Sequence, residues 1–285
     1  MRNLLLTLAL AGTLTTVAQA QVNVEVVLEQ EQYLRSESLP VRVRISNDSG
    51  RALRLGDDFE WLSFTINEES GKQVLKTGDV PLAKPFTIEP AQTISLRTDL
   101  MPHFDLSQLG HYTLNLKMKV PQLQQEVSSK PKSLDIISGV TLWEKDVGVP
   151  GTDPLVTRRY ALQQATFFQQ QRLYVRVTDA TGSRVVKVVS LGQALSISKP
   201  EAVVDNVSHL HVLFRNNQQT FFYGVITTDG ELIIRQTHEF AAGVAPRLRA
   251  ESDGRVVVVS GQRKILLSDL PPSRVANTDE KAGRK

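Results

Sequence analysis

The sequence predicts an all-β protein, and two observations carry this prediction. Apolar and polar residues alternate with a period of two in several segments, among them residues 22–26, 41–45, 114–120 and 134–136. One apolar and one polar face are typical of half-buried antiparallel strands. Turn-forming residues, such as the Asn-Asp-Ser-Gly run at 47–50, separate these segments, and no stretch keeps a helical period. We therefore expect antiparallel sheets along most of the chain.

The N-terminus has the anatomy of a secretory signal peptide over residues 1–20. Arg2 precedes an apolar run at 4–14, and Ala18-Gln-Ala20 forms a small-x-small cleavage site. The apolar run is shorter than the roughly twenty residues that span a bilayer, and an uncleaved anchor is the alternative. We predict cleavage after Ala20 and export to the periplasm or the exterior of a bacterial cell.

The composition removes several classes of function. The chain has no cysteine, which excludes thiol catalysis, disulfides and Cys-ligated zinc. The formal net charge is +3, and several basic residues lie in the segment 271–285, which has few apolar residues and is expected to be disordered. Lysine and arginine do not cluster elsewhere as a nucleic-acid footprint requires. We therefore expect no nucleic-acid partner and, after signal cleavage, no membrane association.

The first domain is expected at residues 21–138. Its Tyr33-Leu-Arg-Ser-Glu37-Ser-Leu39 segment has the form of a turn before a strand, and Gly110-His-Tyr112 has the form of the start of a late strand. In this order the features resemble an immunoglobulin-like sandwich of the bacterial proteinase-inhibitor-like type. The resemblance implies that the Tyr112 hydroxyl bonds back to nearby backbone, as in a tyrosine corner. It implies a fold and leaves the function open.

The second domain is expected at 155–270, after a connection at 139–154 that is rich in glycine and proline and in which residues 140–143 could form one strand. Three segments within it share one pattern, in which a short strand and a polar turn are followed by a second strand. Spacings of this size between copies indicate propeller blades or stacked antiparallel sheets. The second copy resembles a blade of sialidase-type exported propellers, and either a truncated propeller-like stack or a small sandwich remains possible. The three copies are residues 163–175, 200–212 and 246–258.

Two groups of residues have the chemistry of metal ligands. His209 and His211 are two residues apart on an expected strand, and His238 lies on a possible neighbouring strand. The acidic run Asp57-Asp58-Phe-Glu60 could bind calcium through its carboxylates. The spacing of both groups favours solvated turns over metal sites, because no further zinc ligand and no calcium-loop order is present. We therefore expect no metal and no other cofactor.

The enzyme motifs that could be recognised are absent from the sequence. There is no Gly-x-Ser-x-Gly elbow, P-loop or Gly-x-Gly-x-x-Gly. A sialidase-like site would need converging arginines and a tyrosine nucleophile, for which Arg158, Arg159, Arg172 and Tyr160 are candidates. The Ser-x-Asp-x-Gly-x-x-Thr-Trp box of that family is missing, so we predict no catalytic residues.

The sequence therefore favours an exported, non-enzymatic binding or interaction protein, with an unidentified protein or cell-surface glycan as its partner. A carbohydrate-binding module would use Trp61, or the pair Phe221-Phe222, as a flat exposed surface. The other tryptophan of the chain is Trp143. A protease-inhibitor-like module would use a protruding loop such as 77–85. A degenerate propeller hydrolase is the third alternative. The sequence leaves the oligomeric state open.

Overall fold

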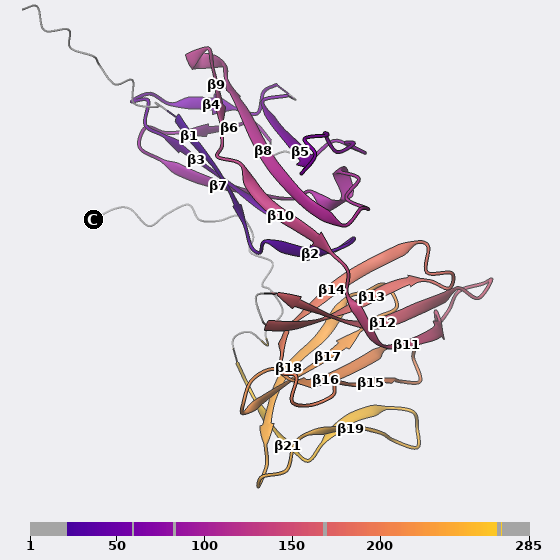
Figure 1. The fold of residues 1–285 in the computed structure, drawn as a ribbon. Coiled ribbons are helices and arrows are strands. Elements are labelled where there is room, and N and C mark those ends of the chain that lie inside the picture. The colour runs from indigo at the N-terminus through magenta and orange to yellow at the C-terminus, as the bar shows by residue number, and fades with distance from the viewer. Residues whose placement is uncertain (1–21, 59, 82–83, 168–169, 267–268, 270–285) are drawn as a thin grey trace, which may run out of the picture.

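The described residues of the computed structural model fold almost entirely into β-sheets (Figure 1). The all-β prediction is confirmed, and the short 3₁₀ helices η1 (Met101–His103) and η2 (Pro121–Leu123) interrupt the strands. The expected signal peptide at 1–20 and the expected disordered segment at 271–285 lie outside the described residues. No helix in the part that the structure describes is long and apolar enough to cross a membrane. The structure describes residues 22–58, 60–81, 84–167, 170–266 and 269.

Two larger sheets form the N-terminal half of the molecule. One has the strand order β1-β3-β7, and the other has the order β2-β10-β8-β5 with β9 paired to β8. Among the described strands of this half, every pairing is antiparallel except that of β2 with β10. β4 and β6 form a short further antiparallel pair. The bounds are β1 Val22–Leu28, β2 Gln32–Leu34, β3 Pro40–Asn47, β4 Leu53–Leu55, β5 Leu62–Glu68, β6 Phe86–Ile88, β7 Thr93–Asp99, β8 Gly110–Val120, β9 Gln125–Ser128 and β10 Lys132–Ile137.

The facing surfaces of these two sheets enclose one apolar core. Along β1, Val22, Val24 and Val26 are buried while Asn23 and Glu25 are exposed. The same alternation holds in β3, β8 and β10, so the predicted period of two is confirmed in all four strands. Burial of each such side chain contributes about 1.5–3 kcal/mol, and the shared core holds the sheets face to face.

Asn47 ends β3 and anchors the turn that follows it. Its Nδ2 donates to the carbonyl oxygens of Arg51 at 2.8 Å and Ile88 at 2.9 Å, and its Oδ1 accepts from the Ser49 amide at 3.1 Å. Asn47 is fully buried, so these bonds offset the cost of removing an amide from water. They also fix the chain reversal that the sequence predicts at 47–50. Past this point the ladder of β3 and β7 gives way to the pair β4 and β6.

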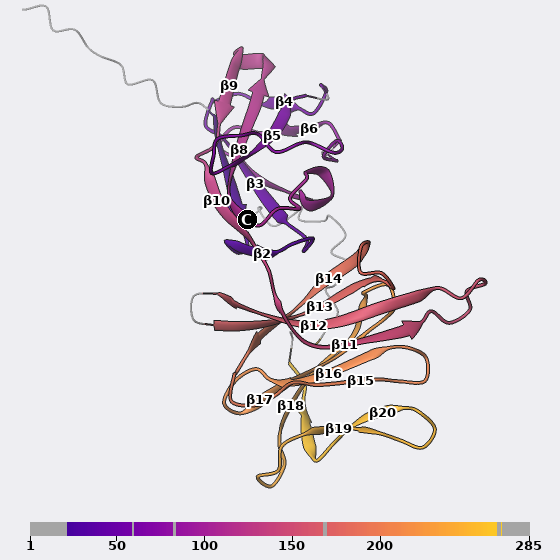
Figure 2. The same ribbon diagram turned by 45° about the vertical axis from the view of Figure 1, so that its right-hand side comes forward.

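Three sheets form the C-terminal half (Figure 2). The first sheet has the order β11-β12-β13-β14, the second sheet the order β15-β16-β17-β18-β21, and the terminal hairpin consists of β19 and β20; all pairings are antiparallel. The bounds are β11 Val140–Gly148, β12 Thr157–Phe167, β13 Gln170–Asp179, β14 Val185–Ala194, β15 Glu201–Val204, β16 Leu210–Arg215, β17 Thr220–Ile226, β18 Leu232–Phe240, β19 Arg247–Ala250, β20 Val256–Val259 and β21 Gly261–Lys264.

The segment 139–154, expected as a connection between domains, differs from that expectation. Most of it forms β11, the edge strand of the first sheet, which pairs with β12 along nearly its whole length. Glycine and proline at its ends gave the appearance of a linker. Within the strand, Val147 is buried and Leu142 and Trp143 pack against the core of this half. The second group of sheets therefore begins at Val140.

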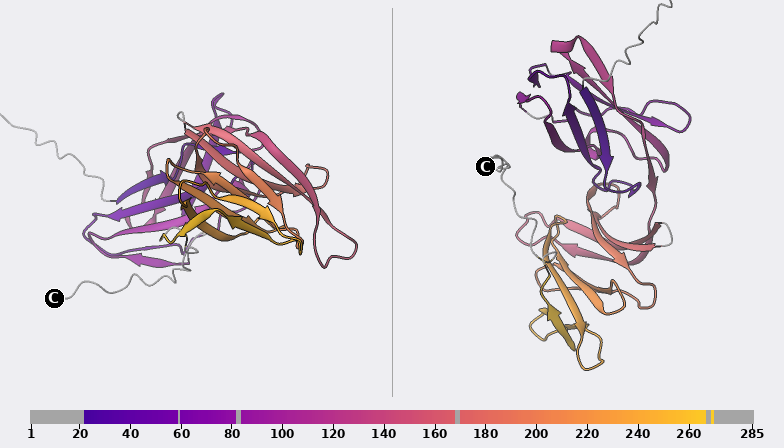
Figure 3. Two further views of the ribbon diagram at one scale, coloured as in Figure 1. Left: turned by 90° about the horizontal axis from the view of Figure 1, so that it is seen from below. Right: turned by 90° about the vertical axis from the view of Figure 1, so that its left-hand side faces the viewer.

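The C-terminal sheets are stacked, as a view from the side shows (Figure 3). Two apolar layers hold the stack together. One layer lies between the first and second sheets and includes Leu173 and Phe222. The other joins the second sheet to the terminal hairpin and includes Phe221 and Val258. Because both faces of the second sheet are covered, all seven residues of β17 are buried. Because every residue of β17 is buried, its sequence does not alternate between apolar and polar residues and is instead a nearly continuous apolar run.

The three sequence copies each fold as a pair of adjacent antiparallel strands. Copy 163–175 falls in β12 and β13, which are the two middle strands of the first sheet. Copy 200–212 falls in β15 and β16, which begin the second sheet at its edge, and copy 246–258 forms the isolated terminal hairpin. The copies therefore share a local hairpin but occupy different places in their sheets.

The two halves of the molecule meet at a small apolar junction. Leu34 of β2 packs there with Tyr174 and Val188 of the first sheet. Two side-chain hydrogen bonds cross the junction: Arg172 donates to Gln30 Oε1, and Arg176 Nη1 donates to the Arg35 carbonyl oxygen at 3.1 Å. The junction thus joins the end of the N-terminal sheets to the outward face of the first sheet.

Candidate functional site

A cleft of about 530 Å³ lies beside this junction, and both halves of the chain line it. The N-terminal half supplies two carboxylates, Glu29 and Glu37, and the C-terminal half supplies two guanidinium groups, Arg172 and Arg235. The cleft therefore has an acidic wall and a basic wall. The remaining lining residues are Gln30, Tyr33, Ser38, Pro40, Val188, Ser190, Leu191 and Gly192.

The acidic wall is built by the turn between β2 and β3. The Glu37 amide donates to the Leu34 carbonyl oxygen at 2.8 Å, and Ser36 adopts φ 68°, the left-handed region that glycine favours. In return, Glu37 Oε2 accepts from the Leu34 amide at 2.7 Å, and Oε1 accepts from Gln30 Nε2 at 3.0 Å. Burial raises the pKa of Glu37, and the two hydrogen bonds and the nearby Arg172 oppose this rise. The turn thus fixes a buried carboxyl beside the junction.

The basic wall consists of two arginines from different sheets. Arg172 on β13 spans the junction to Gln30, as described above. Arg235 on β18 is exposed, and its Cζ lies 5.6 Å from the centre of the Phe222 ring. Among the described residues neither guanidinium forms an ion pair with a carboxylate. Arg235 therefore presents its hydrogen-bond donors to the cleft.

Tyr33 lines the cleft with a buried hydroxyl. The residue is 1% exposed, and its Oη has no partner at hydrogen-bond geometry among the described residues. Burial raises its pKa to about 12, and the nearby Gln30 backbone partly offsets the rise. Tyr33 therefore remains protonated at neutral pH, as a neutral polar group without an acid–base role.

A β-bulge shapes the opposite side of the cleft. The register between β13 and β14 shifts between Leu173 and Tyr174, so that Leu191 is left over on β14. Gly192 follows at φ 102°, a conformation that residues with a side chain rarely adopt. Such bulges re-aim neighbouring side chains, and here the bulge places Ser190 and Leu191 on the cleft wall.

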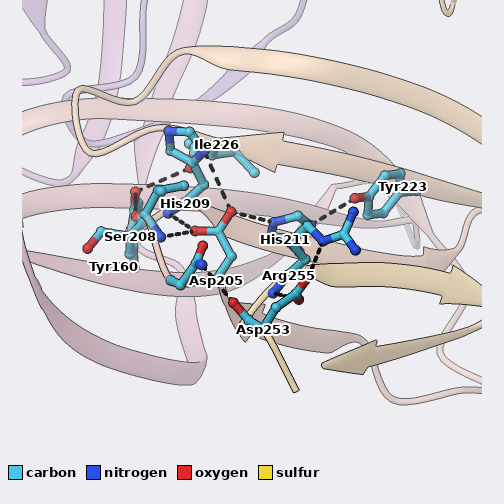
Figure 4. A network of polar contacts seen from close by, with 11 residues as sticks. Tyr160, Asp205, Ser208, His209, His211, Tyr223, Ile226, Asp253 and Arg255 are labelled. Carbon is cyan, nitrogen blue, oxygen red and sulfur yellow. Dashed lines mark hydrogen bonds and ion pairs between the residues drawn. The ribbon is translucent and has the colours of Figure 1, made fainter. Parts of the chain in front are cut away.

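A second polar cluster is buried between the second sheet and the terminal hairpin (Figure 4). His211 Nδ1 lies 2.8 Å from Tyr223 Oη, and its Nε2 lies 3.1 Å from Asp205 Oδ2. Asp205 Oδ1 also accepts from the His209 and Val207 amides. Burial raises the pKa of Asp205, but these hydrogen bonds outweigh it and hold that pKa below its usual range. Burial raises the pKa of Tyr223 to about 12, so its hydroxyl stays protonated. The chain of contacts fixes local structure and presents no activated nucleophile.

The three histidines considered as zinc ligands are divided among different contacts. His211 is committed to Asp205 and Tyr223, and the His209 ring lies beside Asp205, with Nδ1 at 3.7 Å from Oδ2. His238 stacks edge-on against the Tyr223 ring at 5.9 Å. The two buried imidazoles therefore flank Tyr223 instead of facing one another. Within the described residues no three potential metal ligands are gathered.

The acidic run considered for calcium is also dispersed. Asp57 forms a two-point ion pair with Arg54, at 2.7 and 2.9 Å. Glu60 pairs with Lys119 at 3.2 Å, and Asp58 Oδ1 accepts from the Glu60 amide at 3.1 Å. Each carboxylate is therefore directed to its own partner.

The residues considered for a sialidase-like site do not converge. Tyr160 is fully buried, and its hydroxyl donates to the carbonyl oxygens of Ser208 and Ile226 at 3.0 and 3.2 Å. Arg159 pairs with Asp146 at 2.7 Å, while Arg172 lies at the junction. The tyrosine thus faces the second sheet, away from the cleft.

The aromatic residues considered for glycan binding are buried. Trp61 is 2% exposed and packs edge-on against Phe86 with ring centres 5.7 Å apart, so its ring offers no flat surface to a glycan. Neighbouring residues of a strand point to opposite faces, and Phe221 and Phe222 accordingly enter different apolar layers. None of these three rings offers a flat face to solvent.

The loop considered for protease inhibition is anchored at its start. The Thr77 amide donates to the His103 carbonyl oxygen at 2.9 Å, and Val80 is buried in the N-terminal core. Residues 82 and 83 lie outside the described residues. The first half of the 77–85 loop therefore packs against the core instead of protruding.

Sequence reasoning found part of the cleft. The segment from Tyr33 to Leu39 was identified as a turn, but its place beside the C-terminal half has no signal in a local pattern. Arg172 was considered for a different site, and Arg235 was not considered at all. These arginines reach the cleft only because two distant parts of the chain pack together. The periodicity of a single segment does not predict such long-range packing.

Comparisons with known proteins identify no family for this chain. No protein-family model matches the chain, and no curated protein matches it. Among solved structures, the sporulation control protein Spo0M of Bacillus subtilis is 9% identical, with a TM-score of 0.31, over 56% of this chain and 80% of that one. The periplasmic chaperone SfaE is 12% identical, with a TM-score of 0.25, over 74% of this chain and 96% of that one. Both similarities are weak, and the all-β fold rests on the sheets of this chain itself.

Proposed function

We propose that this chain is an exported, non-enzymatic binding protein that takes a polypeptide segment of a partner protein into the cleft at the junction. The observation that carries the proposal is the pair of oppositely charged walls, one from each half of the chain. A polypeptide offers backbone donors and acceptors together with charged side chains, so it can satisfy both walls at once. Electrostatic complementarity of this kind selects and orients partners.

The contacts expected of such a segment follow from the cleft residues. Arg235 is planar and exposed, and it suits a carboxylate or a carbonyl oxygen of the partner. Glu29 on the other wall suits a basic side chain or a backbone amide. Pro40 adds apolar surface to the same cleft. A mixed lining of this type is typical of a protein-binding surface.

We further propose a finer description of the two halves. The N-terminal half is an immunoglobulin-like sandwich, which is supported by its two facing sheets and by the Tyr112 hydroxyl donating to the Gln108 carbonyl oxygen at 2.8 Å. The C-terminal half is a propeller-like stack, which is supported by the meandering antiparallel order of its first two sheets. On this description the cleft lies where the sandwich meets the first blade-like sheet.

Site-specific photo-crosslinking tests the cleft. A photoreactive residue is placed at exposed Ser190 on the cleft wall, or at exposed Ser70 in a distant turn, in cells that make the full chain. We expect a partner adduct from position 190 that is absent from position 70 and is reduced at least fivefold by Arg235→Gln. Arg255→Gln, which changes an exposed arginine paired with Asp253, is the matched control and should leave the adduct unchanged. Equal adducts from both positions would contradict the proposal.

Export is tested separately by cell fractionation and N-terminal sequencing. We expect the chain outside the cytoplasm, with Gln21 as its first residue. A cytoplasmic chain that retains residues 1–20 would contradict the proposed export without bearing on the cleft.

A further inference from the structure

The outer face of the β1-β3-β7 sheet carries Arg42, Arg44 and Arg97, and among the described residues only Arg44 is paired with an acid. Arg42 of β3 lies directly opposite Arg97 of β7 in the ladder, and Arg44 lies opposite Ser95 on the same face. Like charges directly opposite each other destabilise an antiparallel pair. The face therefore holds a repulsive contact that the fold itself does not require.

The neighbouring carboxylates do not neutralise the positive charge of Arg42 and Arg97. Glu25 pairs with Arg44 at 3.7 Å, and within the described residues neither Arg42 nor Arg97 forms an ion pair. Asp99 is two residues beyond Arg97, but its two oxygens accept from the turn before β3 and the start of η1. These bonds come from Ser38 Oγ at 2.7 Å, the Leu39 amide at 2.8 Å and the Met101 amide at 3.0 Å.

The same sheet has an open edge beside these arginines. β7 is the last strand of its sheet and is seven residues long. It has β3 on one side and no strand partner on the other among the described residues. Its ladder with β3 runs without a register shift, and the strand contains no proline. β-bulges and prolines are two of the features that protect natural edge strands from pairing with other chains, and β7 has neither. At the opposite end of the sheet, β1 contacts β9 and β10 instead.

The free edge of the other sheet differs in charge. β5 ends that sheet, and the cations near it are balanced: Lys117 pairs with Glu126 at 2.9 Å and Lys119 with Glu60 at 3.2 Å. An open backbone edge and unbalanced positive charge therefore occur together at β7.

We propose that β7 accepts an extended acidic segment of a partner protein as an added strand. The open edge would supply backbone hydrogen bonds, and the arginines would supply charge complementarity. A residue opposite Arg97 on the outer face would be Asp or Glu and would also lie near Arg42. Residues on the inner face would extend the partly buried row of Ile94 and Leu96, so they would be apolar. The segment would thus alternate acidic and apolar residues. This surface is independent of the cleft.

The probe is a fluorescein-labelled peptide, Val-Glu-Val-Glu-Val-Glu-Val, whose binding to the full chain is followed by fluorescence polarisation. We expect Arg97→Glu to weaken binding at least tenfold and Arg42→Gln to weaken it severalfold. Arg54→Gln, which changes an exposed arginine that is paired with Asp57, is the matched control and should change the affinity less than twofold. A peptide with Lys in place of Glu should not bind. Equal binding to wild type and Arg97→Glu would overturn the proposal.

A second measurement tests the backbone contribution without changing the protein. Two peptides are N-methylated on alternate amides, so that each blocks one edge of the peptide strand. We expect only one of them to lose binding, and the unmodified peptide should slow hydrogen exchange of amides in β7. Equal binding by both methylated peptides would show that charge alone attracts an anionic polymer and would overturn the added strand. A dimer of this chain that Arg97→Glu dissolves would assign the edge to a second copy and would also overturn it.

Discussion

The N-terminal sheets and the C-terminal stack bury their strands in different ways. Each large N-terminal sheet packs one face against the core and exposes the other to solvent. Buried and exposed residues therefore alternate along its strands. The second sheet of the stack is covered on both faces, by the first sheet and by the terminal hairpin. Polar residues on a sheet that is covered on both faces must therefore find hydrogen-bond partners inside the protein. His211, Tyr223 and Asp205 meet that requirement through one another.

The largest expected effect concerns the doubly covered sheet. Phe222 is 4% exposed, its ring lies over Gly224, and a Cβ at that glycine would lie 2.7 Å from a Phe222 ring carbon. We expect Phe222→Ala to lower the free energy of unfolding by about 3–5 kcal/mol. Urea unfolding followed by Trp143 fluorescence, in a Trp61→Phe background, measures it. Asn23→Ala on the exposed face of β1 should change stability by less than about 0.5 kcal/mol, and equal losses would remove the contrast.

The next effect concerns the polar partners within the stack. Asp205→Ala leaves the buried His211 and two backbone amides without their acceptor, and we expect a loss of about 2–3 kcal/mol. Asp146→Ala, which breaks a solvent-exposed ion pair with Arg159, should reduce stability far less than Asp205→Ala does. Because the folded pKa of Asp205 is lowered, its contribution is complete above the unfolded pKa of about 3.9 and is lost as pH falls through the folded pKa. Urea titrations at several pH values check both statements.

A smaller effect is expected from the N-terminal half. Tyr112→Phe removes the hydrogen bond to the Gln108 carbonyl oxygen and keeps the buried ring, so the loss should be about 1 kcal/mol. The midpoint of unfolding reported by Trp61 fluorescence, in a Trp143→Phe background, measures it. A loss as large as that of Asp205→Ala would show that the singly covered sheets depend on polar contacts equally.

The smallest effect is a pH dependence of the stack. Burial lowers the pKa of His238, with Arg263 acting in the same direction. The unfolded chain therefore binds this proton more readily than the folded chain does, and stability should fall as pH drops below about 6.5, through the folded pKa. In His238→Phe this part of the decline should disappear. An unchanged slope between pH 7 and 5 would assign it to other groups.

The sequence predicted local structure well and assembly poorly. Alternation located β1, β3, β8 and β10, because each has one buried and one exposed face. Alternation did not show what covers the buried Trp61, because the ring that packs against it is Phe86 of another strand. The strand β11 was expected as part of a connection, because it is a partly exposed edge strand with glycine at either end. The cleft was missed because Glu37 and Arg235 are brought together by long-range contacts that no local pattern contains.

The burial of β17 makes this strand a hazard whenever the stack is open. Its seven residues, Thr220–Ile226, carry no charge and no proline and are rich in aromatic and β-branched side chains. Such segments form tightly interdigitated amyloid-like sheets when they are exposed on several chains at once. Undocking of the terminal hairpin would uncover one face of this strand, and a chain that has not yet folded would expose both. The same two layers that stabilise the folded stack therefore also keep its most aggregation-prone segment out of reach of other chains.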